Sequence, residues 1–124
     1  MPRKPPHLRR AKSDENKRVM EYNKEDFIAL RIPGSGTSKY FPGDILAFGP
    51  HQVRLELVRR TEKENEITFS KEEISDVKKL AAKLTKLLFP IQIMVICVAH
   101  FPKYRKWDVK QLVNWNGKDI TVEL

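Results

Sequence analysis

The stretch Ser70–Ala99, SKEEISDVKKLAAKLTKLLFPIQIMVICVA, decides the fold class because it joins a capped amphipathic helix to a buried strand. Ser70 followed three residues later by Glu73 matches a capping box, which predicts the start of a helix. Pro90 ends that helix, and the apolar run 91–99 predicts a central strand buried on both faces. The helix buries one face of apolar residues at helical spacing, namely Ile74, Val77, Leu80, Ala81, Leu84, Leu87 and Leu88.

Upstream of this unit, four short runs bounded by Gly, Pro and polar residues are predicted to be strands. They cover residues 27–32, 45–48, 52–58 and 66–69. The charged segment 59–65 is expected to form a hairpin loop before the last of them. Ser13 is predicted to cap an earlier helix that runs to about Tyr22, with Asp14 and Glu15 in its first turn, where the helix dipole favours acids.

Downstream of the buried strand, the chain is predicted to be rich in β-structure. Trp107 and Val109 belong to a further strand, and Asn116-Gly117 predicts a hairpin that joins 112–115 to 120–122. Helix, strands, helix, buried strand and a β-rich end together predict an α/β domain. Its expected architecture is a mixed central β-sheet flanked by helices.

The composition favours a polyanionic partner. The chain has 124 residues, enough for one core, with a net charge of +8 and a pI near 9.7. Its single cysteine, Cys97, cannot form an internal disulfide, which fits a reducing, cytoplasmic setting. No apolar segment approaches the ~20 residues needed to span a bilayer, so no membrane association is expected.

The N-terminal segment 1–12 is predicted to be a flexible basic arm, and 13–124 a single domain. The segment holds three prolines and no acid, so it cannot bury enough surface to fold alone. Its basic residues are candidates for DNA contact: Arg3, Lys4, Arg9, Arg10 and Lys12. Further phosphate-contact candidates are Arg31, Lys39, Arg59, Arg60, Lys103, Arg105 and Lys106.

A glycine-serine turn precedes two carboxylates that could serve one metal ion. Pro33-Gly34-Ser35-Gly36 is followed by Asp44 at a strand start and by Glu56 within the next strand. Mg²⁺ prefers carboxylate and phosphate oxygens, and two or three acids suffice to hold it. If the two strands pair antiparallel, both carboxylates could reach one ion, with Glu56 on a polar strand face. Taken singly, Asp44 also suits a turn, Glu56 a solvated strand and Glu15 a first helical turn.

Three segments resemble the archaeal-type Holliday junction resolvases, a branch of the PD-(D/E)xK nuclease superfamily. They are Ile32-Pro33-Gly34-Ser35-Gly36, Pro42-Gly43-Asp44-Ile45-Leu46-Ala47 and Leu55-Glu56-Leu57. The resemblance continues to Arg105-Lys106-Trp107 and covers residues 13–113. It implies a restriction-endonuclease-like sheet.

The resemblance also implies an activity and a site. By position, Asp44 and Glu56 would be Mg²⁺ ligands, and Glu15 and Ser35 would join them as catalytic residues. Ser35 matches the serine of a turn that lies near the scissile phosphate in the family. The implied protein is a homodimer that binds four-way DNA junctions through a basic face and cuts paired strands with Mg²⁺.

The chain departs from the family pattern at position 58. The family places a lysine two residues after the glutamate, and Val58 stands there instead. A lysine ammonium can orient the attacking water and stabilise charge at phosphorus, and valine can do neither. Arg54, on the face of Glu56, or Lys39 is a candidate substitute, whereas strand alternation points Arg59 to the other face.

Three functions therefore stay open from the sequence. The first is a resolvase-like, structure-selective, Mg²⁺-dependent endonuclease. The second is a catalytically inactive paralogue that binds DNA junctions or a partner; the missing lysine favours it and the three acids oppose it. The third is a basic RNA-binding domain, against which the absence of a surface aromatic motif for base stacking counts. The three histidines show no metal-ligand spacing.

Overall fold

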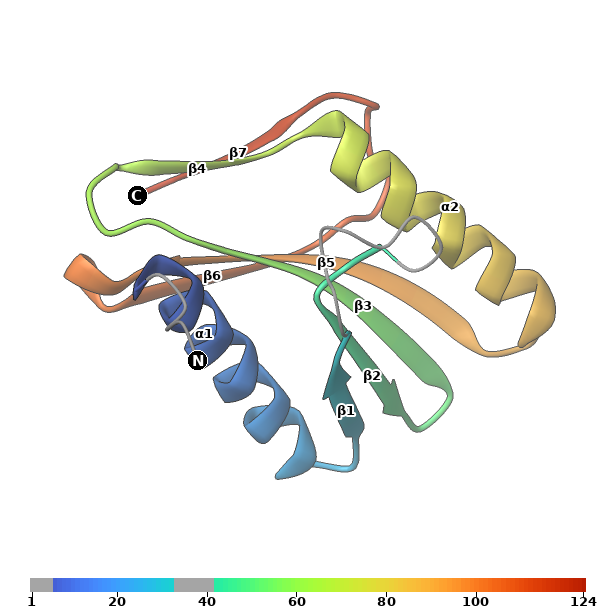
Figure 1. Ribbon diagram of the computed structural model, residues 1–124. Coiled ribbons are helices and arrows are strands. Elements are labelled where there is room, and N and C mark those ends of the chain that lie inside the picture. Colours follow the sequence, from blue (N-terminus) through green and yellow to red (C-terminus); the bar gives the residue numbers. More distant parts are fainter. Residues whose placement is uncertain (1–5, 33–41) are drawn as a thin grey trace, which may run out of the picture.

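The molecule is a five-stranded sheet between two helices, with a small second sheet beside it (Figure 1). The computed structural model describes residues 6–32 and 42–124. Its elements in chain order are α1 Pro6–Asn23, β1 Ile28–Arg31, β2 Ile45–Gly49, β3 Gln52–Arg60, β4 Glu66–Phe69, α2 Lys71–Leu87, β5 Gln92–Phe101, the 3₁₀ turn Pro102–Tyr104, β6 Lys106–Gln111 and β7 Ile120–Glu123.

The main sheet is mixed and has the order β1-β2-β3-β5-β6. Strands β1, β2 and β3 pair antiparallel, as do β5 and β6. The pairing of β3 with β5 is parallel, because α2 carries the chain back across one face between them. The predicted α/β class and flanking helices are therefore confirmed.

Two hydrophobic layers lie on opposite faces of this sheet. On the side of α2, β3 contributes Leu55 and Leu57, which pack with residues of α2, β4 and β7. On the side of α1, β3 contributes Val58, which packs with residues of β2, β5 and α1. Odd-numbered and even-numbered residues of β3 therefore face opposite sides of the sheet, as expected. Helix α1 covers the side of the even-numbered residues.

The long helix has the predicted start. Ser70 caps α2, and its side-chain oxygen accepts a hydrogen bond of 3.2 Å from the Glu73 amide. Glu72 and Glu73 lie in the first turn, where the helix dipole stabilises negative charge. Ile74, Val77 and Ala81 form the buried face. The capping box and the apolar spacing therefore predicted the helix and most of its inward face, but Leu87 at its C-terminal end is exposed, so its predicted burial is wrong.

The first helix begins earlier than its sequence suggested. It starts at Pro6, so Ser13 lies inside α1, and the predicted cap there is wrong. Proline suits a first turn because its missing amide would have no helical partner. Residues 6–12 of the predicted arm are therefore helical, and 1–5 lie outside the described residues. Whether this segment binds DNA stays a prediction.

The hairpin predicted at Asn116-Gly117 is also wrong. Residues 112–115 form no strand, and β7 pairs antiparallel with β4 in the separate two-stranded sheet. The intervening residues make local hydrogen bonds instead: Trp115 Nε1 donates to the Lys118 carbonyl at 2.8 Å. Likewise β3 runs on through Arg60 and does not pair with β4, so 59–65 is not a hairpin loop. Within the described ranges, no helix is long and apolar enough to cross a membrane.

Candidate functional site

Glu56 is fully buried and already has a cationic partner. Arg18 of α1 donates from Nε to Oε1 at 3.0 Å and from Nη2 to Oε2 at 2.7 Å. The Tyr22 hydroxyl donates a further hydrogen bond to Oε2. A two-pronged guanidinium–carboxylate pair of this kind is among the stronger charge-assisted contacts. Both oxygens of Glu56 are thus engaged by α1.

The two partners of Glu56, Arg18 and Tyr22, come from one face of α1. Asp14 shares that face, because the three residues follow one another at intervals of four. Burial alone would lower the pKa of Arg18, and the hydrogen bond to Glu56 raises it above its ordinary value. Burial and the Glu56 charge raise the pKa of Tyr22 to about 12, so its hydroxyl stays protonated and donates. Sequence reasoning missed this polar face.

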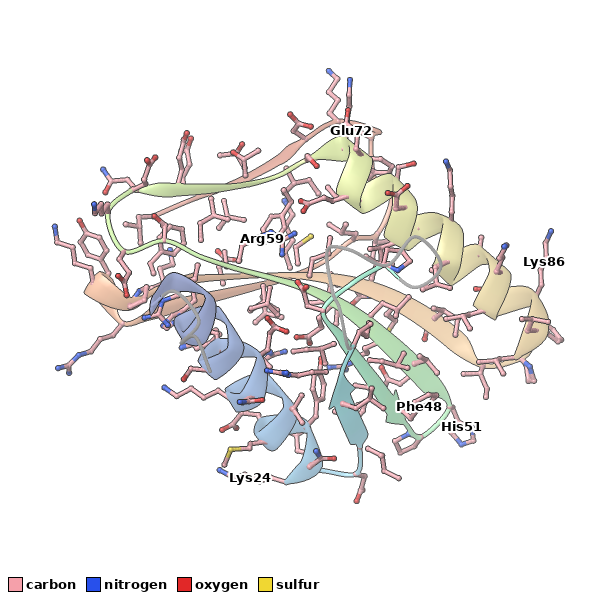
Figure 2. The ribbon with its side chains drawn as sticks, in the orientation of Figure 1. Lys24, Phe48, His51, Arg59, Glu72 and Lys86 are labelled. Carbon is pink, nitrogen blue, oxygen red and sulfur yellow. The ribbon has the colours of Figure 1, made fainter. Side chains whose placement is uncertain are left out.

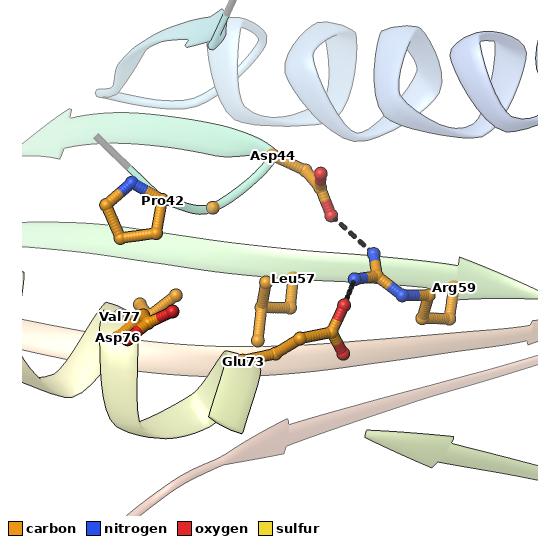
Figure 3. Close-up of a pocket in the computed structure, with 8 residues that line it drawn as sticks. Pro42, Asp44, Leu57, Arg59, Glu73, Asp76 and Val77 are labelled. Atoms are coloured by element: carbon orange, nitrogen blue, oxygen red, sulfur yellow. Dashed lines mark hydrogen bonds and ion pairs between the residues drawn. The ribbon is translucent and has the colours of Figure 1, made fainter. Parts of the chain in front are cut away.

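Asp44 is also buried, and its arginine partner links it to α2 (Figure 3). Its Oδ2 accepts from the Val58 amide at 2.8 Å and from Arg59 Nη1 at 2.9 Å. Arg59 Nη2 bonds Glu73 of α2 as well, so one guanidinium bridges the two acids. Figure 2 shows Arg59 inside the fold, whereas Lys86 projects outward. Arg59 thus lies on the face of β3 opposite Glu56, as strand alternation predicted, and its guanidinium still reaches Asp44.

The Asp44 side chain borders a small polar cavity of ≈ 130 Å³. Arg59, Glu73 and Asp76 add charge to its wall, and Leu57 and Val77 add apolar surface. The bridging guanidinium lies along this wall in Figure 3. The positive charge at this cavity is thus the guanidinium of Arg59.

Glu15 lies on α1 within electrostatic reach of Asp44. Burial, followed by the Asp44 charge, raises the pKa of Glu15 to about 7, and Arg31 and Arg59 act in the opposite direction. The structure therefore brings Glu15 and Asp44 near each other. Glu56 takes part in the separate contact with Arg18 described above.

The residues present do not fit one metal ion held by Asp44 and Glu56. The strands do pair antiparallel, but the register sets Ile45 opposite Glu56, and Asp44 lies one residue outside that pair. Each carboxylate meets a different arginine. No group of three or more His, Cys, Asp or Glu side chains suited to a metal occurs among the residues described. The expected polar face around Glu56 is instead closed by α1 and neutralised.

Arg54, one proposed substitute for the missing lysine, bonds Gln52 rather than either acid. Val58 is buried in the layer under α1, on the face of Glu56 as expected. Arg54 Nε donates to Gln52 at 3.0 Å, and its guanidinium lies 4.9 Å from the centre of the Phe27 ring. Lys39 and Ser35 lie outside the described residues.

The remaining basic candidates are dispersed. Arg60 pairs with Asp14 at 2.9 Å and with Glu62 at 3.0 Å, and Asp14 also bonds His100. Arg31 is half-buried on β1. Lys103, Arg105 and Lys106 are exposed around the turn into β6. Arg9, Arg10 and Lys12 fall on α1, while Arg3 and Lys4 lie outside the described residues.

Comparison with known proteins shows the fold. No protein-family model matches the chain, and no curated protein sequence matches it. Among solved structures, the chain is similar to Archaeoglobus fulgidus Hjc, a Holliday junction resolvase from an archaeal hyperthermophile. The alignment has 20% sequence identity and a TM-score of 0.69, and covers 90% of this chain and 85% of that chain. The two chains share a fold. The nuclease-like architecture expected from the sequence is confirmed.

Proposed function

We propose that this protein binds branched DNA, with a four-way junction as its preferred substrate. This proposal rests mainly on the fold that the chain shares with a Holliday junction resolvase over 90% of its length. The net charge of +8 supports a nucleic-acid partner, because phosphate contacts supply most of the sequence-independent affinity. Phosphate contacts position a protein without reading bases, which suits recognition of junction shape.

We further propose that binding occurs without efficient cleavage. The family lysine is absent at Val58, and both expected metal ligands contact arginines. The inactive paralogue is therefore the alternative that the contacts favour, and Mg²⁺-dependent cleavage by Glu15, Ser35, Asp44 and Glu56 is the one they oppose. Recombination and repair remain the processes in which such binding would act.

A homodimer is part of the proposal, as the family resemblance implies. Ile28, Leu30 and Phe48 are large apolar side chains exposed on β1 and β2. The register places Ile28 beside Phe48 and Leu30 beside Leu46, so these side chains share one face near the edge of the sheet. A second copy could cover them. Sedimentation of the wild type beside Ile28→Lys tests this, since a dimer through this face should dissociate in the variant.

Gel-shift titration against three ligands of equal charge tests DNA binding: a four-way junction, a linear duplex and an RNA hairpin. The junction should bind most tightly, and its affinity should fall steeply with salt because bound phosphates release counterions. Equal affinity for junction and duplex would remove the structure-selective proposal. Tighter binding of the RNA hairpin would favour the RNA-binding alternative.

A variant that removes positive charges from α1 tests whether the basic segment contributes to DNA binding. Replacing Arg9, Arg10 and Lys12 by Gln removes three charges while keeping good helix formers in α1. Junction affinity should fall and the salt slope should become shallower. The matched control replaces Lys78, Lys83 and Lys86 of α2 by Gln, which removes the same charge from the opposite side of the sheet. Equal losses in the two variants would show that net charge, rather than this segment, drives binding.

A further inference from the structure

We propose that Arg18 and Arg59 have replaced the metal ion of this fold as the charge partners of Glu56 and Asp44, so that the chain excludes divalent cations from these acids. The inference concerns the acids alone and holds whether or not the protein binds DNA. It makes the former catalytic positions a pair of internal ion pairs.

The first argument is the saturation of Glu56. A carboxylate ligates a metal through its oxygen lone pairs, and here both oxygens accept hydrogen bonds from Arg18. The Tyr22 hydroxyl takes a further position on Oε2. The Glu56 side chain is 0% exposed, so an incoming ion would have to leave its water and displace a guanidinium. Both requirements oppose binding.

The second argument is the position of Arg59 beside Asp44. Its guanidinium lies 2.9 Å from Oδ2, the oxygen that also accepts the Val58 amide. A second bond to Glu73 holds that guanidinium between β3 and α2. Any cation that approached Asp44 from the cavity would meet this fixed positive charge.

The third argument is that the two acids have separate guanidinium partners. Glu56 is bonded by Arg18 of α1, whereas Asp44 is bonded by Arg59 of β3, which also bonds Glu73 of α2. One ion bound to both carboxylates would therefore have to displace two guanidinium groups that are held by different parts of the fold.

Metal titration of the wild type provides the direct test. Calorimetry with Mn²⁺ and with Mg²⁺ should give no saturable heat, and neither ion should raise the Tm, since a ligand that binds only the native state would do so. The titration is repeated with a four-way junction present. Saturable binding of one ion per chain, with or without junction, would overturn the proposal. Because junction binding is scored separately by gel shift, failure here is distinguishable from failure of the proposed function.

A double variant tests whether the arginines are the cause of exclusion. Arg18→Met with Arg59→Met keeps long side chains in both layers and removes both guanidinium groups. The variant should bind Mn²⁺ with a saturable heat that the wild type lacks, and added Mn²⁺ should raise its Tm. The matched control is Arg60→Met. Arg60 follows Arg59 on β3 and pairs with the buried Asp14 of α1, so this variant also removes an arginine from a buried acid. The control should lose stability without gaining a response to metal.

Two outcomes of the variant experiment would contradict the proposal. A folded double variant, verified by circular dichroism, that gains no Mn²⁺ affinity would show that something other than the arginines excludes the ion. An equal gain in the Arg60→Met control would show that any lost arginine attracts metal. If the double variant does not fold, the single variant Arg59→Met is titrated instead, because its partner Asp44 keeps the Val58 amide. Wild-type titration decides the exclusion itself in every case.

Discussion

The surroundings of Glu56 and Asp44 differ although each acid has an arginine partner. The side chains of Arg18 and Glu56 are 19% and 0% exposed, and those of Arg59 and Asp44 are 33% and 9% exposed. Glu56 depends on side chains of α1 alone, whereas Asp44 also accepts a backbone amide. The same pairing chemistry therefore has unequal energetic weight. The neighbours of each acid, from a helix for Glu56 and from strand β3 for Asp44, set this weight.

Breaking the Arg18–Glu56 pair should give the largest loss of stability. Arg18→Met leaves the Glu56 carboxylate buried without its guanidinium, and removing one partner of a buried pair costs about 3–5 kcal/mol. Arg59→Met should cost about 2 kcal/mol, because Asp44 lies nearer water and keeps the Val58 amide. Urea denaturation of both variants measures the free energy of unfolding.

An exposed ion pair is the control for this comparison. Glu21 and Lys24 lie 3.7 Å apart on α1, with both side chains 67% exposed. Glu21→Gln should change stability by less than about 1 kcal/mol. Equal losses for Arg18→Met and Arg59→Met would contradict the ranking of the two sites. A stabilising effect of Arg18→Met would show that Glu56 was not paired in solution.

Restoring the family lysine should destabilise the protein rather than activate it. Val58 is 7% exposed in the layer under α1, so a lysine there would lose hydration. Burial lowers the pKa of a lysine and makes its charged form costly. Val58→Lys should therefore lower the Tm without producing junction cleavage in Mg²⁺. Val58→Met, of similar length and no charge, is the control, and rapid cleavage by the lysine variant would refute this expectation.

Removing the Tyr22 hydroxyl measures how much this group contributes to the contacts of Glu56. Tyr22→Phe deletes the hydrogen bond to Oε2 but keeps the ring that packs against Phe27. The expected loss is about 1 kcal/mol, because Arg18 still neutralises the carboxylate. Tyr104→Phe on the exposed turn before β6 is the control and should be neutral. A loss as large as that of Arg18→Met would mean that the hydroxyl, not the guanidinium, holds Glu56.

A further expected effect depends on pH and involves Glu15. Its folded-state pKa is raised from 4.5 to about 7, mainly by burial and by the Asp44 charge. The native state therefore holds this proton more tightly than the unfolded chain, and the resulting stability is lost as pH rises from 4.5 to 7. Glu15→Gln should raise the Tm relative to wild type at pH 8 but not at pH 4. Glu25→Gln, on the exposed turn after α1, should show no such pH dependence.

Sequence signals correctly predicted the elements that depend on interactions between residues close together in the chain. The Ser70 cap and the strand 66–69 match the structure, because capping bonds and short apolar runs are read within a few residues. The hairpin prediction at Asn116-Gly117 was wrong because β7 pairs instead with β4, some fifty residues earlier in the chain. A turn signal alone does not report such a distant competitor. The Ser13 cap failed because a helix can extend past a good cap when the preceding residues continue it.

Sequence spacing predicted the strand pairing around the two acids but not the side chains that contact them. Glu56 lies on β3, and Asp44 directly precedes β2, its antiparallel neighbour. Their partners could not be read from strand spacing, since Arg18 comes from a helix thirty-eight residues away. One available signal was the four-residue spacing of Asp14, Arg18 and Tyr22, which marks a polar stripe on an inward helix face. Such a stripe indicates that the helix meets buried acids or histidines.

Cys97 gives the molecule a built-in probe of transient opening. The thiol is fully buried on β5 beneath α2, and burial raises its pKa to about 12. Alkylating reagents attack the thiolate, so the native state should be almost inert and reaction should report excursions that expose β5. The urea dependence of the alkylation rate would then show whether α2 lifts off by itself or only when the whole domain unfolds.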